Sequence, residues 1–433
     1  MAMDRDELNQ KRIARAAQRQ KQLQEQRKLK LRLAIAAVVL TVCGIAIFSL
    51  TRGDGQSSPV SPTDPGITVP TTAPTEPTSR RQSEPTTTIH IKAAGDLNIT
   101  DKVIAAGQTQ LGYDYSTAFL DVAPLLADAD LTMLNFEGIC VGEPYGTESK
   151  SAPREILQAL DAAGVDIIQA ANSYSIYDGI SGLNSTLSAI RSAGMEPVGA
   201  FASPEEFRQS KGYTICDVRG IKVAVVAFTK GMGSLGLPAG SEDCVNVLYT
   251  DYATTYQDVD TEGITAVLKN AAKEEPDITI AMLHWGSEYN DTISETQKKI
   301  AELMLKNGVD IILGTHSHMV HQIAYDKEAN TLVAYSLGDF FGDGAKGGSN
   351  YSVILDIEIT RDNETGVTKI TNHTVTPIYT LSEGESCDGN RRVVRIRQAM
   401  DAYEPNFVDK VTKAAYDSME NSLERINARV NGE

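Results

Sequence analysis

The segment from Asp277 to Phe341 contains two apolar runs of strand length separated by an amphipathic stretch. The runs at 278–283 and 309–313 are rich in β-branched residues, and each is closely followed by histidine. Between them, apolar residues recur at the i, i+3 and i+4 spacing from Ile300, which predicts a helix with Gly308 at its C-cap. Strands joined through a helix run parallel, so the pattern predicts a β-α-β unit.

The same succession of helix, glycine and apolar run occurs twice earlier in the chain. Helices are expected at 154–163, capped by Gly164, and at 183–193, capped by Gly194. Further apolar or alternating runs predict strands at 88–93, 131–134, 165–169, 197–199, 221–228, 351–360 and 368–378. The last two are typical of antiparallel edge or second-sheet strands, and the residues after 391 look helical. The organisation predicts an α/β fold.

The N-terminal pattern is different. Residues 33–50 form an uncharged apolar run that spans about 27 Å as a helix, near the minimum for crossing a bilayer. Ten Lys/Arg precede it in residues 1–32, and residues 51–87 are rich in Pro, Ser, Thr and Gly. A buried core helix and a cleaved signal peptide are the alternatives. The basic arm, and the lack of a small-x-small site after the run, favour a single-pass membrane anchor with the body outside the cell.

Five segments follow from these patterns. They are a basic cytoplasmic arm at 1–32, a transmembrane helix at 33–50, a disordered linker at 51–87, a folded domain at 88–380 and a helical tail at 381–433. The net charge of the chain is −17, although the N-terminal arm is basic. A body this acidic argues against nucleic acid as a partner.

Four cysteines lie in the predicted extracellular part, where disulfides can form. They are Cys140, Cys216, Cys244 and Cys387. Their spacing is not that of a metal site, and a Cys216–Cys244 bridge is one possible pairing.

Polar residues follow the predicted strands at the point where each strand ends. They are Asp96, Asn135, Glu137, Asn172, His284, His316, His318 and Asp339. Each alone is compatible with a turn or a helix cap, but parallel strands bring their carboxyl ends to one edge. An extended backbone would also point His316 and His318, two residues apart, to the same side. Carboxylates with imidazoles predict a divalent metal site for Mn, Zn or Fe, with one or two ions.

Two aromatic residues follow His284 and are candidates for the wall of this cleft. Trp285, the one tryptophan in the chain, and Tyr289 lie just past the predicted strand. Ordinary core packing is the alternative for Trp285.

Six motifs occur in an order that resembles the CapA family of poly-γ-glutamate capsule synthesis proteins, which is related to calcineurin-like metallophosphoesterases. They are GDLN (95–98), NFEG (135–138), AANSYSIYDG (170–179), LHWGSEY (283–289), GTHSH (314–318) and YSLGDF (335–340). The resemblance implies a metallophosphatase-like αββα sandwich outside the cell. It also implies poly-γ-glutamate or another envelope polymer as partner, with membrane polymer-synthase subunits.

One motif departs from the family pattern. Family members usually read Ala-Asn-Asn-His where this chain has Ala171-Asn172-Ser173-Tyr174, and Asp339 stands where Asn is more usual. In the related phosphoesterases the Asn binds metal and the His helps to protonate the leaving group. Tyr174 and His284 are the candidate catalytic residues here. Tyr174 is a poor acid at neutral pH, because the unperturbed pKa of tyrosine is about 10.

Three interpretations follow. The first is a polymer assembly protein that binds metal and has weak or no phosphoesterase activity. The second is an active metal-dependent hydrolase of a phosphoester or amide in an envelope polymer. The third is a metal-free scaffold. An anionic polymer also needs a basic patch on this acidic body, for which Lys150, Arg154, Lys230 and Lys346 are the candidates.

Overall fold

The computed structural model describes residues 85–403 and 411–433, which belong to one compact unit. The predicted arm, the predicted transmembrane segment and nearly all of the predicted linker lie outside these residues. Within the described part, no helix combines the length and the apolar character needed to cross a bilayer. The first strand begins at Thr86, two residues before the predicted start of the folded domain.

The helices of the described part are α2 (Asp101–Ala106), α3 (Ala123–Ala127), α4 (Glu155–Ala163), α5 (Gly179–Ala193), α6 (Pro204–Ser210), α7 (Thr261–Ala272), α8 (Glu295–Lys306), α9 (Ile396–Asp401), α10 (Lys413–Asn431) and the 3₁₀ turn η1 (Glu242–Cys244). The strands are β1 (Thr86–Asn98), β2 (Gln108–Thr109), β3 (Gly112–Tyr113), β4 (Leu131–Glu137), β5 (Ile167–Gln169), β6 (Glu196–Val198), β7 (Tyr213–Val218), β8 (Ile221–Thr229), β9 (Ile278–His284), β10 (Ile311–Thr315), β11 (Ile323–Asp326), β12 (Thr331–Ala334), β13 (Asp339–Phe341), β14 (Tyr351–Asp362), β15 (Thr368–Leu381) and β16 (Arg392–Arg395).

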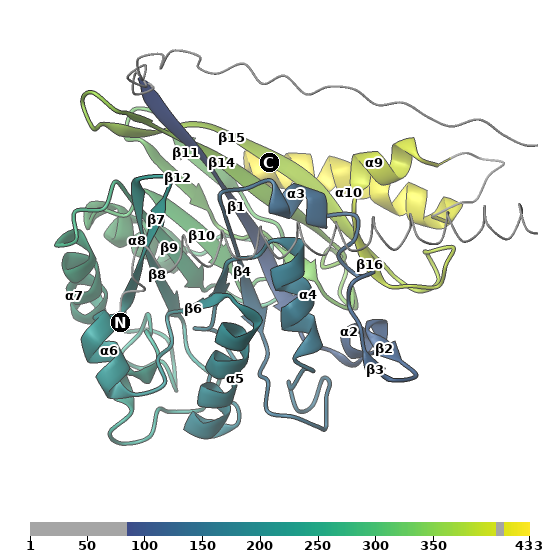
Figure 1. Cartoon of the computed structure of the whole chain (residues 1–433), viewed down its shortest axis with the longest axis horizontal. Coiled ribbons are helices and arrows are strands. Elements are labelled where there is room, and N and C mark those ends of the chain that lie inside the picture. Colours follow the sequence, from purple (N-terminus) through teal and green to yellow (C-terminus); the bar gives the residue numbers. More distant parts are fainter. Residues whose placement is uncertain (1–84, 404–410) are drawn as a thin grey trace, which may run out of the picture. The chain divides into compact units, whose positions relative to one another are not determined.

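Two large sheets form the centre of the unit (Figure 1). The first has the order β16-β15-β14-β1-β4-β5-β6, with β13 paired to β1, and the second has the order β11-β12-β10-β9-β8-β7. Strands β1, β4, β5 and β6 run parallel, and so do β8, β9, β10 and β12. The predicted β-α-β unit is therefore present as β9, α8 and β10.

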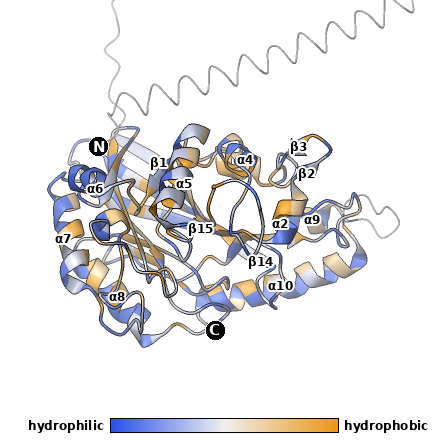
Figure 2. Ribbon diagram, turned by 90° about the horizontal axis from the view of Figure 1, so that it is seen from below, coloured by the Kyte–Doolittle hydropathy of each residue, from blue (hydrophilic) through white to orange (hydrophobic). Residues whose placement is uncertain are grey.

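Helices cover the outer face of each sheet, which gives an αββα arrangement (Figure 2). Alternation along β8 shows how the layers arise. Val223 and Val225 point into the core between the sheets, whereas Ala224 and Val226 face the layer of α7 and α8. Helices α3, α4 and α5 bury their apolar faces against the first sheet. The α/β prediction is confirmed.

Several boundaries differ from the predictions. Helix α8 has Asn307 at its C-cap, and Gly308 follows it with a φ of 90°. Strand β1 does not stop before Gly95 but continues through it to Asn98. Strands β14 and β15 extend the first sheet beside β1, and neither lies at its edge. The pairing of β14 with β1 joins residues that are far apart in the sequence, so no local sequence pattern indicates it.

The C-terminal segment and the cysteines also need correction. Residues after 391 begin with strand β16 rather than a helix, and α10 packs into the core between the sheets through residues such as Met419. The four described cysteines form no disulfide with one another. Cys216 lies in the core between the sheets and Cys244 in the layer outside the first sheet, so the proposed bridge is not formed.

Aspartates stand at the amino ends of four parallel strands. Asp130, Asp166, Asp277 and Asp310 directly precede β4, β5, β9 and β10. Each carboxylate accepts a hydrogen bond of 2.7–2.9 Å from a backbone N–H of the preceding strand in the sheet. Each aspartate N–H donates back to a carbonyl of that strand at 2.8–2.9 Å. These pairs fix the strand register at that edge.

Candidate metal centre

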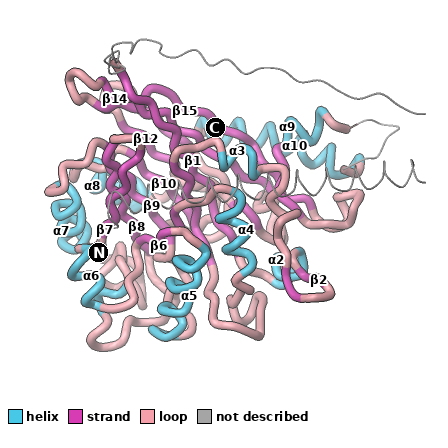
Figure 3. Tube along the Cα trace, in the orientation of Figure 1, coloured by secondary structure: helices cyan, strands magenta, loops and turns pink. Residues whose placement is uncertain are grey.

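Most of the polar residues predicted at the strand ends lie at the opposite edge, at the carboxyl ends of β1, β4, β9 and β10. Asn172 follows β5, and Asp339 begins β13 instead of following a strand. Long loops follow β4 and β9 at this edge (Figure 3). Asp96, Asn135 and Glu137 lie within β1 and β4 rather than beyond them, and Asp96 is in register with both Asn135 and Asp339.

Gly95 makes this register possible. A Cβ at position 95 would lie 1.7 Å from the carbonyl oxygen of Gly338, so only glycine allows β13 to approach β1 this closely. The approach places Asp96 beside Asp339. The GDLN motif therefore contributes both a carboxylate and the glycine that admits its neighbour.

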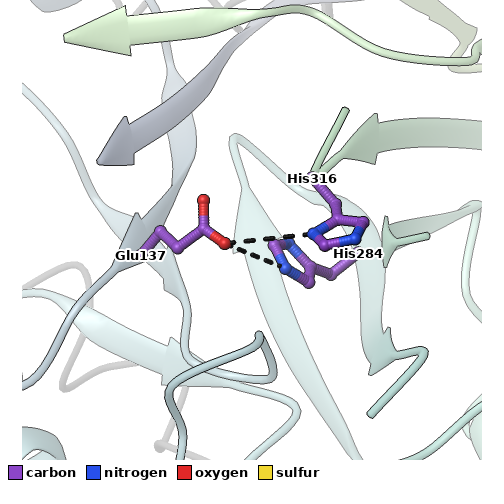
Figure 4. Close-up of side chains that lie close together, drawn as sticks. All are labelled: Glu137, His284 and His316. Atoms are coloured by element: carbon purple, nitrogen blue, oxygen red, sulfur yellow. Dashed lines mark ion pairs between the residues drawn. The ribbon is translucent and has the colours of Figure 1, made fainter. Parts of the chain in front are cut away.

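One group of possible ligands comprises Glu137, His284 and His316, whose side chains point toward one another (Figure 4). The Glu137 Oε1 atom lies 3.3 Å from His284 Nε2 and 4.0 Å from His316 Nδ1. All three side chains are buried. On the far side of the imidazole, His284 Nδ1 contacts Thr315 Oγ1 at 3.1 Å, which orients the ring.

A second group comprises Asp96, Glu137 and His318. His318 Nε2 lies 3.6 Å from Glu137 Oε2, and His318 Nδ1 lies 3.8 Å from Asp96 Oδ2. Glu137 thus belongs to both groups and contributes a different oxygen to each. Two ligand sets that share a carboxylate suit a pair of neighbouring ions.

The backbone that presents the two histidines differs from the prediction. His316 and His318 are not in extended backbone; their φ values are 86° and 58°, in the left-handed region. Residues with side chains rarely adopt this region, and it costs about 1–3 kcal/mol at each position. The His316 N–H donates to Asp96 Oδ2 at 3.0 Å, which helps to hold the turn. Hydrogen bonds, rather than strand alternation, bring both rings to the site.

Charge is distributed unevenly across the cluster. Burial favours a raised pKa for Glu137, but His318 and His284 outweigh it and hold that pKa well below its usual range. Burial, with His284, lowers the pKa of His316 to about 4. Burial opposes protonation of His318, but the carboxylates of Asp339 and Glu137 raise its pKa well above the usual value. Burial and the charge of Glu137 raise the pKa of Asp96.

The donor set fits a divalent transition metal. Both Glu137 carboxylate oxygens are buried and have no hydrogen-bond donor among the described residues, which is costly for a charged group unless a cation completes its environment. Imidazole and carboxylate ligands together suit Zn, Mn or Fe. Asp96, Glu137, His284, His316 and His318 are the residues that would hold such ions.

The three accessory polar residues support these candidates. Asn135 donates to Asp96 Oδ1 at 2.6 Å and lies 3.4 Å from His284 Nδ1. Asn172 donates to Asn135 Oδ1 and to the carbonyl of Phe136. Asp339 Oδ1 lies 2.7 Å from His318 Nδ1, so its carboxylate orients that ring and leaves Nε2 facing Glu137.

Ser173 and Tyr174 are the two residues at which the chain differs from the Ala-Asn-Asn-His motif. Ser173 Oγ lies 2.9 Å from His284 Nε2 and 3.4 Å from His316 Nδ1, so the hydroxyl contacts the first ligand group directly. Tyr174 lies beside the cluster, and burial raises the pKa of its hydroxyl above the usual value. The raised pKa makes Tyr174 a weaker proton donor at neutral pH than an exposed tyrosine.

Trp285 does not line the site, contrary to the prediction. Its side chain is fully buried between the second sheet and helices α7 and α8, with Nε1 donating to the carbonyl of Tyr335 at 2.9 Å. Tyr289, the other candidate wall residue, stacks on His318 with ring centroids 4.9 Å apart.

A cavity of about 610 Å³ opens beside the cluster. Ser173 and His316 form part of its wall, together with Tyr174, Tyr256 and Lys230. The Lys230 ammonium donates to the carbonyl of Gly286 at 2.7 Å and lies 4.7 Å from the centre of the Tyr256 ring. The sequence suggested Lys230 as a loop cation but not its place beside the cluster.

Two more of the suggested cations lie near the site. Lys150 lies over the ring of Tyr174 at 4.7 Å, and Lys346 lies over the ring of Tyr289 at 5.9 Å. Arg154, the fourth, precedes α4. Thr315, which is in register with His284, was not predicted, although its place directly before His316 was a usable signal in the sequence.

Comparison with known proteins gives a consistent result. The family model of the bacterial capsule synthesis protein PGA_cap matches residues 90–343. The capsule biosynthesis protein CapA of Bacillus anthracis is 28% identical over 263 residues, which cover 59% of this chain and 60% of that protein. The PGA biosynthesis protein CapA of Bacillus subtilis is 27% identical over 270 residues, covering 60% of this chain and 66% of that protein. The matches thus span less than two thirds of either relative.

Solved structures show weaker likenesses. The calcineurin-like phosphoesterase YfkN from Bacillus subtilis aligns with a TM-score of 0.43 and 16% identity, covering 79% of this chain and 100% of that one. A phosphatase from Mycoplasma pneumoniae aligns with a TM-score of 0.41 and 13% identity, covering 68% of this chain and 94% of that one.

Proposed function

The chain belongs to the PGA_cap family of bacterial capsule synthesis proteins, and on this premise we propose that it is a metal-binding protein of poly-γ-glutamate synthesis, export or anchoring. The observation that carries the proposal is the buried cluster around Glu137, which lies within the matched region. The relatives named as capsule and PGA biosynthesis proteins support the choice of polymer.

Some residues of the cluster are candidate metal ligands, and others orient those ligands. Asp96, Glu137 and the three histidines would hold the metal, and Asp339 and Thr315 keep two of the rings in position. A bound metal would supply Lewis-acid stabilisation of negative charge on a substrate oxygen. Tyr174 faces the cavity beside the cluster, where its high pKa makes it a hydrogen-bond donor rather than an acid. We therefore assign the site weak or no phosphoesterase activity.

Deletion of the gene in its own host tests the assignment. Loss of γ-linked glutamate polymer from the cell surface, restored by the wild-type gene but not by a Glu137→Gln variant, is the expected result. Unchanged polymer in the deletion strain would exclude the proposed function.

An active hydrolase of a phosphoester or amide in an envelope polymer is the second candidate. It is favoured by the cavity beside His316 and Ser173, because 610 Å³ lies within the range of about 300–1,000 Å³ typical of small-molecule sites. Rapid turnover of an activated phosphodiester by the metal-loaded wild type would promote this candidate over the first.

For location, we propose that residues 33–50 anchor the protein in the membrane with the folded body outside the cell. The support is the uncharged apolar run that follows a basic arm. Membrane polymer-synthase subunits would then be the neighbouring partners. Protease added to intact cells should release a fragment that begins within residues 53–87, whereas full protection of the body would reverse the orientation.

A further inference from the structure

The cavity beside the cluster combines one cationic anchor with aromatic and apolar walls. Lys230 is the one lysine among the described residues that line it, and Glu288 is the one carboxylate. Tyr174, Tyr177 and Tyr256 supply ring surfaces, while Met232 and Leu235 add apolar contacts. Such a lining suits a ligand that alternates short aliphatic segments with negative charge.

The anchor is tied to the metal centre through the backbone. The Lys230 N–H donates to the carbonyl of His284 at 2.7 Å, and the ammonium donates to Gly286, two residues past that histidine. Gly231 continues the wall, and a Cβ there would lie 2.2 Å from the carbonyl oxygen of Tyr252. The ammonium therefore lies at a position set by the same strand end that presents His284.

We propose that this cavity is the subsite that holds a γ-linked glutamyl segment, with an α-carboxylate paired to the Lys230 ammonium. The proposal rests on the proposed function and names how its polymer is recognised. A γ-linked chain has two methylenes in each backbone repeat and a pendant carboxylate. The methylenes lie against the tyrosine rings and Leu235, the carboxylate meets Lys230, and the neighbouring amide lies beside His316 and Ser173.

Electrostatics fix the orientation of the segment. The chain carries a net charge of −17, so a polyanion is repelled over most of the surface and attracted where lysines gather. Within the cavity, Glu288 repels a carboxylate and turns it toward Lys230. The Lys150 ammonium lies over the ring of Tyr174 and adds positive charge on that side of the cavity.

Binding of a γ-linked glutamate oligomer of about five residues to the full chain in detergent tests the proposal, measured by calorimetry at low and high salt. Lys230→Gln should weaken binding at least about tenfold, because it removes a charge-assisted hydrogen bond. Lys299→Gln, which removes an exposed lysine from α8, is the matched control and should leave affinity unchanged. Glu288→Gln should strengthen binding several-fold, a gain that misfolding cannot produce.

Equal affinities in the Lys230→Gln and Lys299→Gln proteins would overturn the subsite while leaving the proposed function to the gene-deletion test. No binding of the oligomer to the wild type, or equal binding of an α-linked oligomer of the same charge, would also overturn it. Binding of inorganic phosphate without binding of the oligomer would also overturn the proposed subsite.

Discussion

Acidic side chains lie at both ends of the parallel strands, but their hydrogen-bonding environments differ. At the amino ends, Asp277 and Asp310 are satisfied by backbone N–H groups of the neighbouring strand. At the carboxyl ends, Glu137 is buried, and neither of its oxygens has a hydrogen-bond donor among the described residues. Acids whose carboxylates accept backbone hydrogen bonds hold neighbouring strands in register, whereas an acid left without donors among histidines is available to a cation.

The largest expected effect comes from Glu137, because both ligand groups share it. Glu137→Gln should lower metal affinity by at least about 100-fold, more than the 10- to 100-fold typical of losing a residue that only orients a ligand. Metal competition with a chromogenic chelator would measure it. The exposed Glu424→Gln variant is the control, and equal affinities in the two variants would remove the distinction between the edges.

Substitution of Asp277 tests the role of the acids at the amino ends of the strands. Asp277→Ala should lower the free energy of unfolding by about 1.5–3 kcal/mol, since it removes a charged acceptor from the Lys222 N–H and from Arg361. Urea unfolding followed by the fluorescence of buried Trp285 gives the value. Asp277→Asn keeps an acceptor and should lose less. A marked fall in metal affinity in either variant would show that the edges are not independent.

The candidate site could be predicted because each of its acids and histidines lies at or just past the end of an apolar run. It failed where the local backbone is irregular. The left-handed turns at His316 and His318 depend on hydrogen bonds to distant residues, and the place of Ser173 depends on a loop. Trp285 was predictable in principle: strand alternation points the residue after His284 to the opposite face of the sheet.

The fold was predicted to a similar extent. Helices and parallel strands have local periodicity, and most of those that were predicted lie within a few residues of their observed bounds. Helices α2, α3, α6 and α7 were not predicted. The joining of β14 to β1 and the extension of β1 past Gly95 required contacts between remote segments. The aspartates before β4, β5, β9 and β10 were visible as a repeated residue before an apolar run, although nothing in a single run reveals the neighbour that each one bonds.

Restoring the family motif sharpens the comparison at the carboxyl edge. Ser173→Asn with Tyr174→His should raise turnover of an activated phosphodiester at least about tenfold, because it returns a ligand and a proton donor to a cluster that keeps its other residues. Turnover would be measured with metal in excess for both proteins. No gain, with metal bound, would mean that the cleft is built for binding.

The smallest effect concerns pH at the amino edge. Burial raises the pKa of Asp310 to about 6, although the Thr279 N–H opposes the shift. A raised carboxyl pKa means that the folded state binds more protons than the unfolded state between about pH 4 and 6, so this contribution to stability falls as pH rises through that window. Asp310→Asn should flatten this part of the profile of thermal midpoint against pH. An unchanged profile would contradict the assignment.

Elemental analysis of the purified wild-type chain tests the central claim, that the carboxyl edge is a metal site, most directly. After incubation with Mn, Zn or Fe and removal of excess ion, we expect one or two equivalents of divalent metal per chain. A folded protein that retains no metal under all three conditions would contradict it.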